Sequence, residues 1–332
     1  MGRRTTLLED YRELKESGSS SDFPNILGNV MYRSLIDWAK SVPDAWRSYA
    51  AIGDLADFRP ATRVVGYEAE DLIKVEEDGA YIDSKLADAS YTVTLATYGR
   101  QFSINRKVII NDDLGYIKKQ PQRFGRAAGR AIATFVAQTL LEGNGNTFDA
   151  QALFNATATI GHANLTTGGG SVLTAANVQT AITALNKQTV LGVFHSVQPK
   201  WLLIPPALQW TARQILNSAI IIAAGHASAS AFTSVGNINV LQGALGLMID
   251  PFLSSATGWY VLADPADVPI LDVGFLNGKQ TPDLLVERPT MMNLAGGDDP
   301  YELEFDTLHY KVRYDYGGSP SLWWGGYKSA GA

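Results

Sequence analysis

The residues that most often carry catalysis or bind metals are scarce in this chain. There is no cysteine among the 332 residues, which excludes disulfides, thiolate nucleophiles and cysteine-ligated metals. The four histidines, none of which belongs to a His-Glu-x-x-His pattern, are His162, His195, His226 and His309. Neither a Gly-x-x-x-x-Gly-Lys-Ser/Thr phosphate loop nor a Gly-x-Ser-x-Gly nucleophile motif occurs. We therefore predict no catalytic residue, no cofactor and no metal, and expect surface or structural roles for the histidines.

A short acidic segment is the most concentrated charged feature. Residues 68–88 contain eight acids but only two bases, Lys74 and Lys85. The candidate contact residues within it are Glu68, Glu70, Asp71, Glu76, Glu77 and Asp78. The segment lacks the regular oxygen-ligand spacing and the closing Glu of a calcium loop. Three interpretations stay open: a solvated hairpin tip, a contact with basic groups of a neighbouring subunit, and a cation site.

Three arginines form the clearest basic feature. Arg123, Arg126 and Arg130 are three and four residues apart in a segment with helical periodicity, so they lie on one side of the predicted helix. Such a stripe is compatible with a solvated helix face, with ion pairs to a neighbouring subunit, or with contacts to nucleic-acid phosphates. The sequence leaves these alternatives open.

Four tryptophans lie in segments without an obvious core pattern. Trp38 and Trp46 are near one end of the chain, and Trp323 and Trp324 are near the other. Large apolar side chains that gather on a surface usually mark contacts with partners. We expect these tryptophans to be exposed in the single chain and to be buried at subunit interfaces.

Four helices are predicted from apolar residues that recur with a period of about 3.6. They cover residues 23–42, 121–142, 174–188 and 206–217. Pro121 suits the first turn of the second helix, Gly143 is placed to end it, and Thr174 is a candidate N-cap of the third.

Strands are predicted where apolar and polar residues alternate or where apolar residues run together. They cover residues 63–67, 91–95, 201–204, 238–242, 246–250, 258–263, 268–274 and 301–316. The first two form a long hairpin around the acidic segment, and an extended two-stranded hairpin usually lies on another surface because it is marginally stable alone. Residues 143–172 are rich in Gly, Asn, Thr and Ala and are predicted to be an insertion loop.

The composition favours a protein that is partly covered by partners. Charged residues make up 18% of the chain, whereas about 25% is usual for soluble domains. The net charge is −6, and outside residues 68–88 there are 25 acids and 25 bases. The chain therefore lacks the overall positive field of a nucleic-acid-binding protein. Neither a signal peptide nor a membrane span is indicated, so we expect synthesis in the cytoplasm and no membrane contact.

The order of these elements resembles the major capsid proteins of tailed bacteriophages with the Hong Kong 97 fold, and most closely the Mu-like major head subunits. The stretches that carry the resemblance are LATYGRQFSINR (95–106), NDDL (111–114), LTAANV (173–178), KWLLIP (200–205) and WYVLADP (259–265). The likeness extends over nearly the whole chain from about residue 23. Each motif alone is only moderately specific, but their order is distinctive.

The resemblance implies an α+β fold in four parts. These are an N-terminal arm at 1–60, an extended β-hairpin loop at 61–106, a peripheral domain with a spine helix at 107–172 and 266–332, and an axial domain at 173–265. It also implies hexamers and pentamers in an icosahedral shell around double-stranded DNA, with the extended loop lying on a neighbouring subunit. Interfaces of obligate assemblies bury roughly 2,000–5,000 Å², which would cover a hairpin and an arm that have little core of their own.

The same resemblance implies further partners and a location. A portal and decoration proteins are expected. Only a short arm precedes residue 23, so the chain either uses a separate scaffold or is a trimmed product, and Met1 favours the separate scaffold. Contact with the packaged DNA is expected to be weak and non-specific. The shell is expected to assemble in the bacterial host cytoplasm and to become the virion capsid. An encapsulin-like compartment that stores a cargo enzyme is the alternative from another class, and an α/β enzyme is a third possibility, which the scarcity of His and Cys disfavours.

Overall fold

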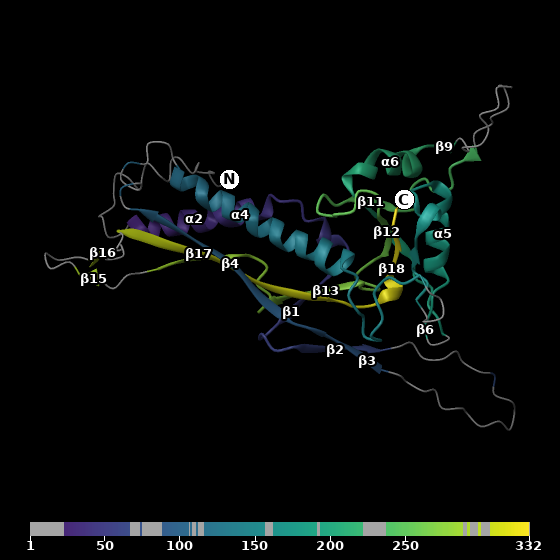
Figure 1. Cartoon of the computed structure of the whole chain (residues 1–332), viewed down its shortest axis with the longest axis horizontal. Coiled ribbons are helices and arrows are strands. Elements are labelled where there is room, and N and C mark those ends of the chain that lie inside the picture. Colours follow the sequence, from purple (N-terminus) through teal and green to yellow (C-terminus); the bar gives the residue numbers. More distant parts are fainter. Residues whose placement is uncertain are drawn as a thin grey trace, which may run out of the picture. The chain divides into compact units, whose positions relative to one another are not determined.

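A computed structural model of the chain describes most of its residues (Figure 1). The described residues are 23–66, 74, 88–105, 107, 111, 116–156, 162–190, 193–221, 237–287, 291–292, 298–299 and 306–331. Contacts divide the chain into two compact units. The first comprises 1–42, 96–131 and 279–315, and the second comprises 43–95, 132–278 and 316–332. No helix in the described part is long and apolar enough to cross a membrane.

The first unit packs two helices with a small antiparallel sheet. Its elements are α2 (Phe23–Lys40), most of α4 (Tyr116–Thr134), β4 (Leu95–Asn105), β14 (Asp283–Val286), the first part of β17 (Thr307–Pro320), β15 (Met291–Met292) and β16 (Asp298–Asp299). Both β4 and β14 pair with β17. Phe102 stacks on Phe124 of α4 and on Tyr310 of β17, which joins the helix to the sheet.

Helix α2 crosses α4 at two glycines. A Cβ atom at Gly125 would overlap the carbonyl oxygen of Leu35, and one at Gly129 would lie 2.7 Å from the carbonyl oxygen of Ala39. Because glycine has no side chain, the two backbones approach more closely than any other residue at these positions would allow. The pair of glycines on α4 thus determines where the N-terminal helix is attached.

The second unit contains a five-stranded mixed sheet. Its strand order is β11 (Gly246–Ile249), β8 (Pro199–Ile204), β12 (Trp259–Ala263), β18 (Gly326–Ser329) and β5 (Leu165–Thr166). Helix α5 (Ala175–Asn186) packs on β8, β12 and β18. Its N-cap Thr174 accepts a hydrogen bond from the backbone N–H of Asn177, as its position predicted. Both the strand at 199–204 and the helix α6 (Gln209–Asn217) that follows Pro206 are confirmed.

The root of the predicted hairpin is a separate two-stranded sheet that contacts a second sheet of this unit. Strand β1 (Ala51–Leu55) runs parallel to β13 (Leu271–Leu276), which pairs antiparallel with the end of β17. Strands β2 (Ala61–Gly66) and β3 (Asp88–Val93) pair antiparallel in register from Ala61↔Val93 to Gly66↔Asp88. The hairpin is therefore confirmed at its root, whereas nearly all of the intervening segment lies outside the described residues.

Shorter elements complete the second unit. They are η1 (Ala45–Ser48), the π-helix η2 (Phe135–Glu142), η4 (Gly168–Ser171), β6 (Thr189–Val190), β7 (Val193–Phe194), η5 (Pro206–Leu208), β9 (Ile220–Ile221), β10 (Asn237–Ile238) and η6 (Trp323–Gly325). The long helix ends at Glu142 with Gly143 as its C-cap, as predicted.

Several predicted boundaries need correction. Helix α4 begins at Tyr116, so Pro121 lies inside the helix rather than at its start. A proline there has no N–H to donate to the carbonyl of residue 117, so one helical hydrogen bond is missing. The strand predicted at 238–242 ends at Ile238, because the side chain of Asn239 accepts a hydrogen bond from the N–H of Leu241 and closes a turn. The predicted loop at 143–172 contains β5.

The predicted four-part division stays a prediction, and two strand pairings link segments assigned to different parts of it. Residues 51–55, predicted to lie in the arm, form β1 of the second unit. Strand β18, predicted in the peripheral domain, pairs with β12 in the sheet that also holds β8. Both pairings join segments far apart in sequence, and periodicity within each segment carries no information about such pairing.

Candidate assembly surfaces

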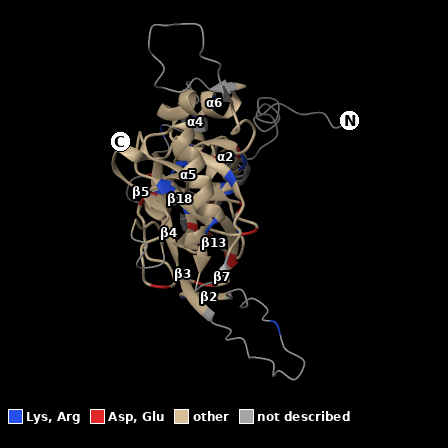
Figure 2. Cartoon of the chain, turned by 90° about the vertical axis from the view of Figure 1, so that its right-hand side faces the viewer, with Lys and Arg blue, Asp and Glu red and all other residues tan. Residues whose placement is uncertain are grey.

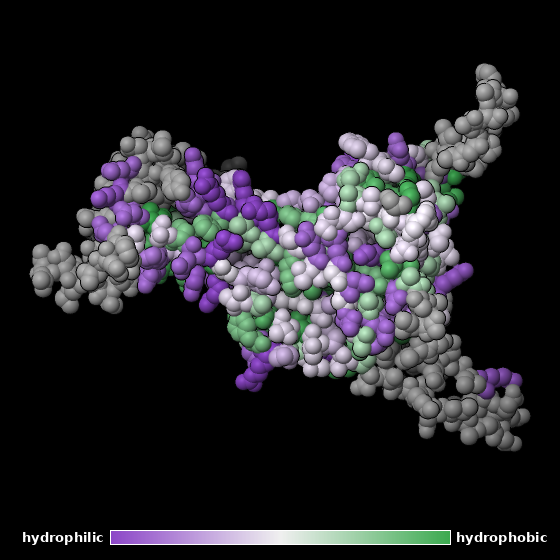
Figure 3. All heavy atoms as spheres, in the orientation of Figure 1, coloured by the Kyte–Doolittle hydropathy of each residue, from purple (hydrophilic) through white to green (hydrophobic). Residues whose placement is uncertain are grey.

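Four basic side chains lie along the exposed side of α4. They are Lys119, Arg123, Arg126 and Arg130, and the nineteen residues of the helix include no acid. Their spacing places them within about 60° of the helix circumference, so the predicted arginine stripe on one side is confirmed. In Figure 3 hydrophilic atoms gather over α2 and α4. We call this set of four residues the basic stripe.

One member of the basic stripe is held by a tryptophan. The guanidinium carbon of Arg126 lies 4.1 Å from the ring centroid of Trp38, which is half-buried on α2. This cation–π contact orients the guanidinium while leaving its N–H groups in water. Trp38 is therefore partly covered by its own chain, and its remaining exposed surface is available to a partner.

The other three tryptophans are buried within the second unit, so the prediction that they are exposed was wrong. Trp46 is 2% exposed, Trp323 3% and Trp324 4%. Trp46 packs against Phe275, and Trp323 and Trp324 contact each other edge to face at 5.6 Å. Their surroundings come from strands distant in sequence, which explains why no local core pattern marked them. An interface role in the folded chain is therefore not supported for these three residues.

The hairpin root is tied to the sheet beneath it. Arg63 Nε of β2 lies 3.5 Å from Asp272 Oδ2 of β13, and the Tyr91 hydroxyl of β3 donates a hydrogen bond to the same oxygen at 3.1 Å. Burial raises the pKa of the Asp272 carboxyl above its usual value, although Arg63 and Tyr91 oppose the shift. This buried acid thus joins both strands of the hairpin root to β13.

The outer face of the hairpin has no cover from the described residues. Val64 is 71% exposed, and Thr62 and Thr92 beside it are exposed as well. The six acids predicted to make contacts lie beyond this root and outside the described residues: Glu68, Glu70, Asp71, Glu76, Glu77 and Asp78. Their role at an interface stays a prediction.

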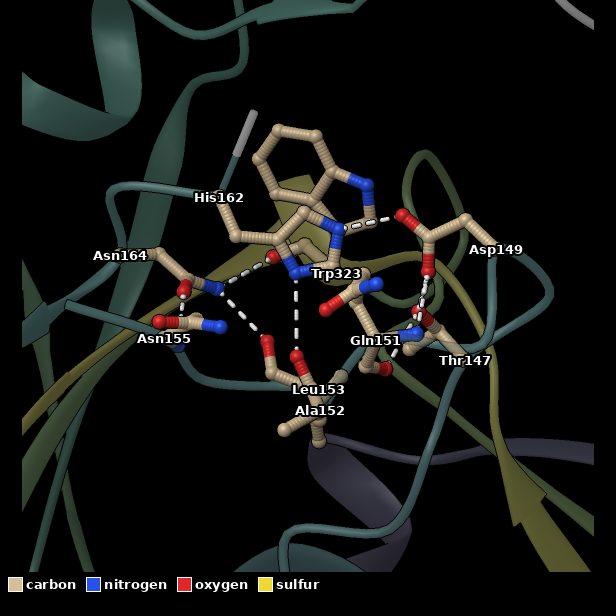
Figure 4. A network of polar contacts seen from close by, with 9 residues as sticks. All are labelled: Thr147, Asp149, Gln151, Ala152, Leu153, Asn155, His162, Asn164 and Trp323. Atoms are coloured by element: carbon tan, nitrogen blue, oxygen red, sulfur yellow. Dashed lines mark hydrogen bonds and ion pairs between the residues drawn. The ribbon is translucent and has the colours of Figure 1, made fainter. Parts of the chain in front are cut away.

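A buried polar cluster, which the sequence did not reveal, surrounds His162 (Figure 4). His162 has no exposed surface, and its ring stacks on Trp323 with centroids 4.1 Å apart. Nε2 lies 2.6 Å from Asp149 Oδ2, and Nδ1 lies 3.0 Å from the carbonyl oxygen of Ala152. Both ring nitrogens therefore face oxygen acceptors of the same chain.

The carboxylate in this cluster is stabilised in its charged form. Burial alone would raise the pKa of Asp149, but hydrogen bonds from the Thr147 hydroxyl, the Gln151 N–H and His162 outweigh it and lower the pKa below its usual value. The Thr147 hydroxyl donates to Asp149 Oδ1 at 2.7 Å. The ionised carboxylate is therefore the form that the folded chain favours.

Asn164 joins the same loop to the C-terminal turn. Its side-chain amide nitrogen lies within 3.2 Å of the carbonyl oxygens of Leu153, Trp323 and Gly326, and its side-chain oxygen accepts from the N–H of Asn155. Asn164 is fully buried. One side chain thus serves backbone groups of its own loop and of the turn at Trp323, which lies 159 residues further along the chain. The cluster around His162 and Asn164 therefore has a structural role, because it joins this loop to the C-terminal turn.

The described residues present no arrangement typical of catalysis. They include no group of three or more His, Asp or Glu side chains that could hold a metal ion. A second buried acid, Asp250, accepts a hydrogen bond from the Tyr49 hydroxyl at 2.9 Å, and burial raises the pKa of both groups. Such a pair ties η1 to the turn after β11 and supports packing.

Comparison with known proteins identifies the family. The family model described as "Phage capsid protein" matches residues 89–329, which is well over half of the chain. The chain belongs to the phage capsid protein family. The subunit is accordingly a structural component of a virion capsid that associates with other copies of itself. A search of curated proteins gave no match.

Solved phage structures share the fold of this capsid subunit. The structure from Mycobacterium phage Patience is 11% identical with a TM-score of 0.55, covering 92% of this chain and 87% of that one. The structure from Microbacterium phage Oxtober96 is 12% identical with a TM-score of 0.52, covering 85% and 86%. That from Mycobacterium phage Adephagia is 14% identical with a TM-score of 0.50, covering 90% and 87%. The predicted α+β fold of the Hong Kong 97 type is thereby confirmed.

Proposed function

We propose that this capsid subunit is the major head protein, which assembles as hexamers and pentamers into an icosahedral shell that encloses phage double-stranded DNA. The observation that carries the proposal is the family match over residues 89–329 together with the capsid fold. The assembly takes place in the bacterial host cytoplasm, and the chain supplies structure rather than catalysis.

The hairpin supports a role in contacts between subunits. Its inner face packs on its own unit, where Val93 and Leu95 are buried with Leu55. Its outer face, with Val64 71% exposed, is covered by nothing in the described chain. Because a two-stranded sheet is marginally stable, a neighbouring subunit that covers this face stabilises the extended loop. Assembly then supplies the burial that a single chain lacks.

Charge complementarity supports a second contact. The acids of segment 68–88 on one subunit pair with Arg123, Arg126 and Arg130 of its neighbour. The half-buried Trp38 beside Arg126 contributes apolar surface to the same contact. Such pairs fix the register of two subunits more than they raise affinity, because exposed ion pairs are individually weak.

Charge reversal of the acids tests this contact. We expect the triple variant Glu76→Lys, Glu77→Lys and Asp78→Lys to fold normally but to lose shell closure, as seen by light scattering. A second triple change in the same chain, Arg123→Glu, Arg126→Glu and Arg130→Glu, should restore assembly because it reverses both partners. The matched neutral control is Glu76→Gln, Glu77→Gln and Asp78→Asn, which should weaken assembly less. Normal shells from the lysine variant would contradict the contact.

The packaged genome is expected to be held weakly. A subunit with a net charge of −6 attracts DNA only locally, so the shell encloses the genome without binding it tightly.

A separate scaffold, a portal and decoration proteins are the proposed further partners. Coexpression with the neighbouring genes, nuclease treatment of purified particles and extraction of their contents test the DNA claim. Protected double-stranded DNA is the expected content, whereas a protein cargo without DNA would favour an encapsulin-like compartment.

A further inference from the structure

Lys328 differs from the other lysines in its exposure. Among the lysines whose side chains the structure describes, it alone is half-buried. The exposed ones are Lys40, Lys74, Lys107, Lys119, Lys187, Lys200, Lys279 and Lys311. In Figure 2, where β5 and β18 are labelled, most of the ribbon is tan, so few charged residues lie on this side of the chain. A lysine that is withdrawn from water is unusual, because the charged ammonium form loses its hydration there.

The sheet positions the amine of Lys328 over two aromatic rings. Strand β18 pairs antiparallel with β12, and Tyr260 is directly opposite Lys328, so the two side chains lie on the same face of the sheet. The Nζ atom lies 5.6 Å from the ring centroid of Phe154 and 5.7 Å from that of Tyr260. Both rings are 1% exposed, and their centroids are 5.6 Å apart. The charged end of the side chain, and not only its apolar stem, therefore contacts aromatic surface.

Two opposing effects act on the charge of this amine. The titratable groups near it are Tyr260 of β12 and Glu142 at the end of η2. The aromatic rings and the carboxylate of Glu142 favour the ammonium form. Burial favours the neutral amine and is the larger effect, so the pKa of Lys328 is lowered below its usual value. More of this amine is therefore neutral at physiological pH than in a fully hydrated lysine.

Glu142 is held in place by backbone groups. Its Oε2 and Oε1 atoms accept hydrogen bonds from the N–H groups of Ser254 and Ser255, at 2.9 and 3.0 Å. These donors compensate part of the carboxylate charge. The influence of Glu142 on Lys328 is thus limited, in agreement with burial being the larger effect.

A neutral amine that still reaches solvent is a nucleophile towards activated acyl groups. With an acyl phosphate, the lone pair of Nζ attacks the carbonyl carbon. The N–C bond forms while the C–O bond to phosphate breaks, and phosphate leaves with the bonding electrons and takes up the amine proton as hydrogen phosphate. The lysine becomes an amide. Because phosphate is a good leaving group, the step requires no further catalytic group.

We propose that Lys328 is a modification site, at which a small acyl phosphate converts the half-buried amine into an amide. The rings of Phe154 and Tyr260 offer an apolar surface to a short acyl chain. The amide carries no charge, so burial between these rings no longer opposes a charged group. This proposal is independent of the shell function, because it concerns a site within one unit of the folded chain.

Acetyl phosphate and the purified wild-type chain test the proposal at pH 7. Peptide mass spectrometry over time gives the acetylation rate of each lysine. Lys328 should react at least about threefold faster than Lys187, because the neutral fraction of an amine rises about tenfold for each unit by which its pKa falls, while burial slows access. Lys187, which is exposed at the end of α5, is the internal control. Equal or slower acetylation of Lys328 would overturn the proposal.

The pH dependence of the same rates separates charge from access. The preference for Lys328 should shrink between pH 7 and pH 10, because exposed lysines lose their protons near a pKa of about 10.4 and then react as well. A ratio of the two rates that stays constant over this range would mean that access alone sets the rate. That result would also overturn the proposal.

Charge removal at Glu142 gives an independent readout. Glu142→Gln keeps an oxygen acceptor but removes the charge that favours the ammonium form, so Lys328 should be acetylated faster at pH 7 while Lys187 is unchanged. The matched control Asp267→Asn, at an exposed acid after β12, should change neither rate. Unchanged or slower acetylation of Lys328 in a Glu142→Gln chain that circular dichroism shows to be folded would contradict the proposal.

Lys328→Arg provides a variant that does not depend on Glu142. It retains a positive charge on β18 but has no amine that can be acetylated at pH 7. The folded variant should lose the fast phase of acetylation and keep the slow phase of the exposed lysines. A fast phase of undiminished size would assign the reactive amine to another residue and overturn the proposal.

Discussion

Two aromatic rings in this capsid subunit contact basic side chains, but in opposite environments. Trp38 is half-buried and lies under Arg126, whose guanidinium is on the outside of α4. Trp323 is buried against His162, which has no exposed surface and whose two ring nitrogens both have partners. A tryptophan beside a basic side chain therefore serves a surface in one unit and the interior in the other. We expect substitutions at the buried site to reduce stability and those at the exposed site to reduce assembly.

The largest effect on stability is expected at Asn164. Asn164→Ala removes a fully buried side chain that serves three carbonyl groups and one N–H. Each buried polar group left without a partner costs about 1–3 kcal/mol, so the free energy of unfolding should fall by roughly 3 kcal/mol or more. Urea unfolding followed by tryptophan fluorescence measures the loss. The control Asn146→Ala, at an exposed position, should reduce the free energy of unfolding far less. Equal reductions in the two variants would contradict the special role of the buried site.

A smaller effect is expected where α2 crosses α4 next to Trp38. Gly125→Ala would place a Cβ atom against the carbonyl oxygen of Leu35 and 3.1 Å from the Cβ of Trp38. The overlap should cost about 2 kcal/mol, despite the higher helix propensity of alanine. Gly169→Ala is the control, because no atom lies within 4 Å of the added Cβ. If thermal unfolding shows Gly125→Ala to be as stable as the wild type, then α2 is not packed on α4 as described.

Features that depend on neighbouring residues could be predicted from the sequence, whereas those that depend on distant segments could not. The periodic apolar residues of 121–142 predicted the long helix, and Thr174 as N-cap predicted the start of α5. Helical spacing placed Arg123, Arg126 and Arg130 on one side of α4. The environment of Trp46 depends on Phe275, more than two hundred residues away, so local pattern indicated an exposed residue where the structure has a buried one. His162 looked isolated because its stacking partner Trp323 follows 161 residues later. The π-helical turns after Thr134 likewise have no signal in a period of 3.6.

The carboxylate of Asp149, which contacts His162, predicts a dependence of stability on acid. Asp149 has a pKa lowered in the folded state, so its stabilising contribution is present above its unfolded pKa of about 3.9 and is lost as the pH falls through the folded value. Asp149→Asn should cost about 1 kcal/mol at neutral pH. The difference in unfolding free energy between wild type and variant should shrink below about pH 4. A difference that stays constant from pH 7 to pH 3 would exclude an ionised Asp149 as the partner of His162.

The smallest effect on stability is expected at the exposed site. Arg126→Gln removes a cation–π contact worth about 0.5–1 kcal/mol at exposed positions. The shell yield should nevertheless fall, because the guanidinium is proposed to contact a neighbouring subunit. Circular dichroism melting and quantitative sedimentation, performed on the same preparation, separate the two effects. A variant that loses stability without losing assembly would reverse the roles that we assign to the two sites.

Electron microscopy of the purified chain tests the central claim most directly. If the subunit forms a shell through surfaces of its own, negatively stained samples of the chain expressed alone should contain closed shells, tubes or rings of capsomers, with matching sizes in light scattering. Expression with the neighbouring genes should increase the fraction of closed particles. A monodisperse dimer or tetramer under both conditions would contradict the account.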